Sequence, residues 1–154
     1  MGIAGARSVP PMSPMARTMK PWYRPFLYLW VLPASLLGLA LVPLAVLWGG
    51  SARVVDGVLE VEGGLVARLL RRGLPWTGQG AAITLGHVVL GCDRRCLDFT
   101  RAHERVHVRQ YERLGPLFIP AYLGASLWLA LRGRHPYLDN PFEREAFGET
   151  KMRS

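Results

Sequence analysis

Two of the four histidines in the chain stand four residues apart around a glutamate, in the sequence His103-Glu104-Arg105-Val106-His107. On an α-helix, residues four apart lie one above the other on the same face, so both imidazoles would point the same way. Two neutral imidazoles so placed can bind one Zn²⁺ ion, and Glu104 can reach a water molecule on that metal. The alternative is an exposed helix whose charged residues make ordinary ion pairs, but this grouping of histidines favours a metal site.

The flanking residues predict the helix that this motif needs. Asp98 is a good N-cap, and Leu97 before it can form a hydrophobic staple. Gly115 suits the position that follows the last helical residue, and Pro116 cannot continue the same hydrogen-bond ladder. We therefore expect a helix over residues 99–114.

A catalytic zinc usually takes three protein ligands and leaves a fourth position for water. Beyond the motif, the chain offers five side chains as the third ligand: His135, Asp139, Glu143, Glu145 and Glu149. Alone, the charged stretch around Glu143 and Glu145 is typical of an exposed helix face that pairs with Arg144. An upstream H-E-x-x-H motif favours a ligand instead.

Together these segments resemble the gluzincin class of zinc metallopeptidases, in which the third ligand is a glutamate on a downstream helix. In the membrane-bound HtpX and CAAX prenyl protease types, this glutamate begins an E-x-x-A-D run. The sequence Glu143-Arg144-Glu145-Ala146-Phe147 matches its Glu and Ala and has Phe147 in place of Asp. The resemblance therefore nominates Glu143 as the third ligand, and Glu145 could replace the missing carboxylate.

The resemblance covers about residues 82–147 and implies a minimal catalytic core of this type. His103, His107 and Glu143 would hold Zn²⁺, which lowers the pKa of a bound water towards ~7. Glu104 would take the proton of that water and pass it to the leaving amine. A strand over residues 82–90 would pair with an extended peptide. One further side chain could stabilise the oxyanion: His87, His135 or Tyr137. A histidine in an apolar stretch, as at His87, is more typical of a hydrogen-bonded core residue than of a ligand.

The composition favours a protein associated with a membrane. Half of the 154 residues are hydrophobic and 19% are charged, and the length suits one modest domain. The net charge of +8 comes from arginine, because lysine occurs only at Lys20 and Lys151. Such a charge suits nucleic acid or an anionic lipid surface. No nucleic-acid-binding motif is present, whereas a long apolar segment is, so we expect membrane lipid as a partner and no nucleic acid.

That apolar segment covers residues 26–48 and contains no charged side chain. Its length matches the ~20 residues that a helix needs to cross a bilayer. Aromatic residues flank it as in an interfacial belt: Trp22, Tyr23, Tyr28, Trp30 and Trp48. Pro33 and Pro43 predict kinks, which membrane helices tolerate. A signal peptide is the alternative, but the segment is long for one and no clear cleavage site follows it.

The chain thus divides into a disordered basic tail (1–24), a transmembrane anchor (25–50) and a small zincin-like metal-binding domain (51–154). We expect the inner (cytoplasmic) membrane of a bacterium as its location, crossed once. The apolar residues 116–131 are short for a second crossing, so they predict a buried or half-embedded helix. Close to the anchor, basic residues before it slightly outnumber basic residues after it. This difference favours a cytoplasmic N-terminus.

The remaining patterns predict an α+β fold. Asp56-Gly57 between residues 53–55 and 58–61 is a strong hairpin signal. Residues 65–72 fit a short helix or a strand, and residues 82–90 fit one buried strand. Asn140 and Pro141 mark the start of a short helix over residues 142–147. Two cysteines, Cys92 and Cys96, could close a disulfide in an oxidising compartment or remain thiols.

The leading hypothesis is a membrane-anchored zinc metallopeptidase that acts on a peptide or protein substrate. One alternative is a non-catalytic membrane protein that retains a zincin-like scaffold with a structural metal. Another is a membrane adaptor in which the motif is accidental.

Overall fold

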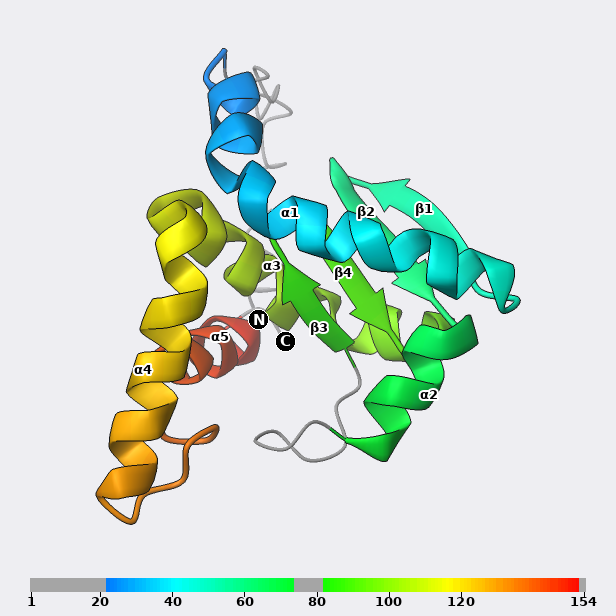
Figure 1. Ribbon diagram of the computed structural model, residues 1–154. Helices are drawn as coiled ribbons and strands as arrows, with labels where there is room; N and C mark the ends of the chain where they lie inside the picture. The colour runs from blue at the N-terminus through cyan, green and yellow to red at the C-terminus, as the bar shows by residue number, and fades with distance from the viewer. Residues whose placement is uncertain (1–21, 74–81, 153–154) are drawn as a thin grey trace, which may run out of the picture.

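The computed structural model describes residues 22–73 and 82–152, which form an α+β fold (Figure 1). Its sheet has the order β1-β2-β4-β3, with antiparallel hairpins β1/β2 and β3/β4 joined by a parallel β2/β4 pair. The four strands are β1 (Ser51–Val55), β2 (Val58–Glu62), β3 (Ala82–Leu85) and β4 (Val88–Gly91). The tail predicted over residues 1–24 lies almost wholly outside the described residues.

The hairpin predicted at Asp56-Gly57 is confirmed, and one predicted strand is wrong in part. Asp56 and Gly57 have φ angles of 49° and 81°, as a two-residue turn that matches the strand twist requires. Residues 82–90, expected as a single strand, instead form β3 and β4 with a turn at Gly86 and His87. Gly86 has a φ of 63°, and a Cβ there would collide with Ser35. A run of apolar residues does not show where such a turn falls.

Helices cover both faces of the sheet. One face carries α1 (Arg24–Leu47) and α2 (Gly64–Arg72), and the other carries α3 (Arg94–Leu114) (Figure 1). The segment that fitted either a helix or a strand is thus the helix α2. Because side chains alternate along a strand, Val88 packs with α1 and α2 while Val89 packs with α3.

The helix α1 contributes to the core of the fold. Its buried residues are mostly small: Val31, Ala34, Ser35, Gly38 and Ala45. A Cβ on Gly38 would lie 2.6 Å from the Cβ of Val88, so glycine allows α1 to approach β4 closely. Two helical stretches, Arg24–Leu47 and Arg94–Leu131, are long and apolar enough to cross a membrane, a test that core helices of soluble proteins also pass.

The helix that carries the H-E-x-x-H motif begins five residues earlier than predicted. It starts at Arg94, and Asp93 is its N-cap, because the Asp93 carboxylate accepts a hydrogen bond of 2.9 Å from the backbone of Cys96. Asp98, the predicted cap, instead forms ion pairs with Arg53 and Arg101. The predicted end is confirmed, since Gly115 ends the helix with a φ of 56°. Cys92 and Cys96 form no disulfide with each other.

Two further helices complete the site. After a 3₁₀ turn at Gly115–Leu117, α4 (Phe118–Leu131) leads to α5 (Pro141–Lys151), which packs against α3. The predicted cap is confirmed, because Asn140 accepts a hydrogen bond from the backbone of Phe142. The fully buried Asn140 amide also donates to Ser126 and to the backbone of Tyr122 on α4. These bonds fix the start of α5 against α4.

Candidate metal centre

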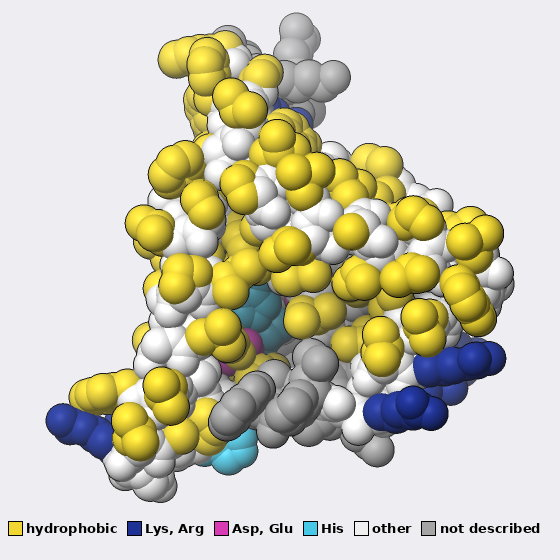
Figure 2. Space-filling model, viewed as in Figure 1, with side chains coloured by type: hydrophobic (Ala, Val, Ile, Leu, Met, Phe, Trp, Pro, Cys, Tyr) yellow, Lys and Arg dark blue, Asp and Glu magenta, His cyan; other side chains and the backbone are white. Residues whose placement is uncertain are grey.

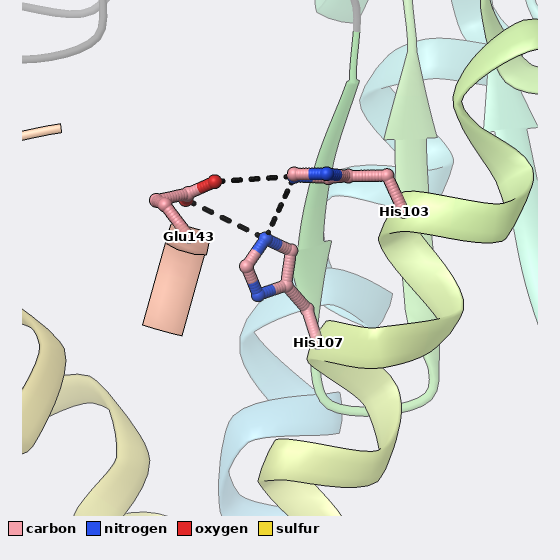
Figure 3. A group of neighbouring side chains, drawn as sticks. All are labelled: His103, His107 and Glu143. Atoms are coloured by element: carbon pink, nitrogen blue, oxygen red, sulfur yellow. Dashed lines mark hydrogen bonds and ion pairs between the residues drawn. The ribbon is translucent and has the colours of Figure 1, made fainter. Parts of the chain in front are cut away.

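Three predicted ligands converge at the contact between α3 and α5. His103 and His107 point from successive turns of α3 towards Glu143 in the first turn of α5 (Figure 3). One ligand atom from each of the three lies within 4.8 Å of the others. Within the described residues, this is the one group of three or more histidine, cysteine or acidic side chains arranged so that it could hold a metal ion.

The separations suit a small metal ion. The Nε2 atoms of His103 and His107 lie 3.1 Å apart. The carboxylate oxygens of Glu143 lie 3.1 Å from His103 Nε2 and 3.5 Å from His107 Nε2. In a tetrahedral zinc site with bonds of ~2.0–2.2 Å, neighbouring ligand atoms lie about 3.3–3.5 Å apart. The three side chains therefore stand close to the spacing of metal ligands.

A second set of side chains orients His107. Its Nδ1–H donates to the side-chain oxygen of Gln110 over 2.8 Å, which leaves Nε2 as the nitrogen free to bind a metal. The Gln110 amide in turn donates to the backbone of Phe142 and, over 2.8 Å, to Glu145. Glu145, expected to replace a missing carboxylate, thus reaches His107 through Gln110.

Glu143 is held as a buried carboxylate. Burial raises the pKa of its side chain, but the adjacent imidazoles of His103 and His107 and the Tyr122 hydroxyl lower it to about 2. That hydroxyl donates to Oε1 over 2.7 Å. The other oxygen, Oε2, is buried and accepts no hydrogen bond of good geometry from the described residues. A buried carboxylate oxygen that faces an imidazole nitrogen without a well-formed hydrogen bond to it fits a metal ligand.

The same carboxylate affects His107. Burial lowers the pKa of His107, but the Glu143 and Glu104 carboxylates outweigh burial and raise it above its usual value. Either a proton or a metal cation on these imidazoles compensates the buried negative charge. A metal ion that binds here must displace that proton.

Glu104 lies beside these ligands rather than among them. It is buried, and the hydroxyl of Thr84 on β3 donates to its Oε2 over 2.6 Å. Burial raises the pKa of Glu104, although His107, Thr84 and His103 oppose the rise. A buried carboxylate whose pKa is raised is suited to accept and release a proton.

Of the three candidate oxyanion donors, the structure brings one to the centre. Burial and the nearby carboxylates of Glu143 and Glu104 raise the pKa of Tyr137, so its hydroxyl stays protonated. His87 is buried elsewhere, with its ring against Tyr28 and its Nε2 3.2 Å from Glu112. His135 is exposed, and its Nδ1 accepts two backbone hydrogen bonds within its own loop.

Phe147 occupies the position where the resembled pattern has an aspartate. Its ring packs on His103, with the centroids 4.7 Å apart, and against Tyr137. At this position, therefore, an aromatic ring and not a carboxylate contacts His103.

Three residues that support the centre do not stand out in the sequence: Thr84, Gln110 and Tyr122. Each comes from a different element, and each is an ordinary residue of an apolar or amphipathic segment. The one available signal was the position of Gln110, one helical turn after His107, where its side chain can reach the imidazole.

A hollow opens on one face of the molecule between α1 and α4 (Figure 2). Figure 2 shows histidine and acidic side chains at the base of this hollow, between the apolar side chains of α1 and α4. No protein-family model matches the chain, and no curated protein or solved structure matches it. The geometry of the centre therefore carries the functional argument.

Proposed function

We propose that this protein is a zinc-dependent peptidase that works at a membrane. The observation that supports it best is the convergence of His103, His107 and Glu143 at the separations of metal ligands. Two imidazoles and one carboxylate are a donor set that zinc enzymes use, with one position left for water. The group suits other divalent metals of similar preference, and the choice of zinc is part of the proposal.

The roles of the protein's own groups follow from their positions. A bound Zn²⁺ ion supplies a water of lowered pKa and polarises the carbonyl of a substrate. Glu104 accepts the proton of the attacking water and passes it to the leaving amine, which its raised pKa favours. Thr84 holds the Glu104 carboxylate against β3 by donating a hydrogen bond to it. The neutral hydroxyl of Tyr137 is the available donor for an oxyanion.

Metal analysis of the purified full-length protein tests the first half of the proposal. The wild type should contain about one zinc per chain, as a site of three protein ligands predicts. His103→Ala and Glu143→Gln should lose the metal, and His135→Ala should retain it because His135 lies outside the group. Wild-type protein that binds no zinc, or a His103→Ala variant that binds it equally well, would rule the centre out.

Hydrolysis tests the second half. Glu104→Gln should keep the bound zinc and lose cleavage of unfolded or membrane-bound polypeptides, since the amide cannot accept the proton. A second candidate, a structural metal site without catalysis, is favoured by the burial of Glu104, His107 and Glu143. It predicts zinc in the wild type with no cleavage that depends on Glu104.

A further inference from the structure

Exposed apolar side chains of α1 and α4 gather on one face of the molecule (Figure 2). We refer to these side chains as the apolar face: Leu29, Leu36, Leu37, Val46 and Leu47 of α1, and Leu123, Leu127, Trp128 and Leu131 of α4. After Arg24, neither helix carries a charged residue. An exposed apolar patch that extends over two helices marks a surface that is covered in the functional state.

We propose that the apolar face lies flat in one leaflet of a bilayer, so that α1 and α4 run along the membrane rather than through it. This inference concerns how the fold meets the membrane and does not depend on the proposed peptidase activity.

The packing of α1 argues against a crossing orientation. The helix contacts all four strands, as well as α2 and α3 (Figure 1). If α1 stood upright in a bilayer, the sheet beside it would lie at the same depth. Among the described residues, β1 pairs with β2 alone, so its outer edge would then face hydrocarbon, where open sheet edges do not occur.

The charged groups on the α3 side of the sheet also argue against a crossing orientation of α1. Glu60 of β2 is buried and accepts hydrogen bonds from Arg53 and Arg101. Arg53 also pairs with the exposed Asp98. Ionised side chains at the depth of the bilayer centre are costly, and this cluster would lie there beside an upright α1. With the apolar face flat on the membrane, the cluster stays in water.

The charges around the apolar face identify the occupant as lipid. Basic side chains border it at α2 and at the end of α4 (Figure 2): Arg68, Arg71, Arg72, Arg132 and Arg134. Of these, Arg68, Arg72 and Arg132 form no ion pair with a described residue. Arg132 lies 4.2 Å above the ring of Trp128. Arginine beside tryptophan at the border of an apolar surface is typical of contact with anionic headgroups.

Counting labels on a double-cysteine variant tests the orientation. Trp22→Cys and Ser51→Cys place one thiol at each end of α1, in a full-length chain in which Cys92 and Cys96 are replaced by alanine. The protein is bound to sealed vesicles of phosphatidylcholine and phosphatidylglycerol, treated from outside with a membrane-impermeant maleimide, and weighed by intact mass spectrometry. Circular dichroism checks that the variant is folded. If the chain with alanine at positions 92 and 96 does not fold, the same two thiols are introduced into the chain that keeps Cys92 and Cys96. The labelling of that chain without the two added thiols is then subtracted.

A flat orientation gives two labels per molecule, because both ends of α1 lie on the outer side. A crossing orientation gives one label per molecule in vesicles and two in detergent, whichever way the chain inserted, and would overturn the proposal. Folded protein that binds no vesicles would overturn it too, since another protein or a second copy must then cover the apolar face.

Substitutions within the apolar face add an independent test. Leu127→Glu should lower binding to the mixed vesicles about tenfold or more, because it places a charge where an exposed leucine would otherwise enter the bilayer. Phe99→Glu is the matched control, since Phe99 is 88% exposed on α3, behind the sheet, and its replacement should leave binding unchanged. Equal effects of the two substitutions would contradict the assignment of the surface. Vesicles of phosphatidylcholine alone should bind the wild type more weakly, as the basic border requires.

Discussion

Replacing Gln110 by leucine should weaken zinc binding without removing a ligand. The side chain of Gln110 is 1% exposed and links His107, Phe142 and Glu145 through three hydrogen bonds. Leucine has a similar size and keeps the helix, but it cannot accept the Nδ1–H of His107. In the wild type, the hydrogen bond to Gln110 fixes the orientation of the His107 imidazole and keeps its Nε2 free for the metal. The leucine variant lacks this bond.

Two free energies should change, by different amounts. Loss of a partner that orients a metal-binding histidine typically costs about 10–100-fold in metal affinity. That range corresponds to about 1.4–2.8 kcal/mol. In the metal-free protein, the buried Nδ1–H of His107 loses its acceptor, which should lower the free energy of unfolding by about 1–3 kcal/mol.

Competition with a chromophoric chelator measures the zinc affinity, and urea unfolding of the metal-free protein measures the stability. Glu149→Gln is the control, because Glu149 lies on α5 and pairs with Arg109 rather than with Gln110. Its zinc affinity should equal that of the wild type. If folded Gln110→Leu binds zinc as tightly as the wild type, Gln110 does not orient a metal-bound His107, and the reasoning fails.

Three further predictions follow from the packing and the charges. Burial raises the pKa of Glu60, but the hydrogen bonds that Glu60 accepts from arginine outweigh burial and hold this pKa below 4.5. The ionised Glu60 therefore stabilises the fold above that pH, and this stabilisation is lost below it. Glu60→Gln should cost about 1–2 kcal/mol at neutral pH, and urea unfolding should show a smaller difference from wild type in acid. Gly38→Ala should lower the melting temperature, because the close contact with β4 has no room for a methyl group and overpacking costs about 1–3 kcal/mol. Gly124→Ala should instead raise the melting temperature, because Gly124 has open space around it. Thr84→Val removes the hydrogen bond that favours the ionised form of Glu104, so the pKa of Glu104 should rise. The acid limb of the pH–activity profile should therefore move to higher pH. An unmoved limb would exclude Glu104 as the group that titrates.

Local patterns predicted much of the secondary structure, because they depend on residues a few positions apart. The turn at Asp56-Gly57, the cap at Asn140 and the end of a helix at Gly115 all follow from backbone preferences and side-chain hydrogen bonds within one or two turns. The same locality explains the errors. Asp93 and Asp98 both fit an N-cap, and the apolar run over residues 82–90 fits one strand or two.

The sequence alone placed His103 and His107 on one helix face, since a four-residue spacing has that effect in any α-helix. Among the five possible third ligands, a resemblance nominated Glu143, but only the packing of α5 against α3 brings its carboxylate beside both imidazoles. The supporting hydrogen bonds of Thr84 and Gln110 depend on the same packing.

The apolar helix shows the same division between sequence and tertiary structure. Composition and length identified α1 as a segment able to lie in lipid, because hydropathy is a property of the residues themselves. Composition says nothing about what one side of a helix contacts. Tertiary packing decided that small residues of α1 lie against the sheet and that the larger leucines stay outside. The reason is that close approach requires glycine and alanine where the backbones meet.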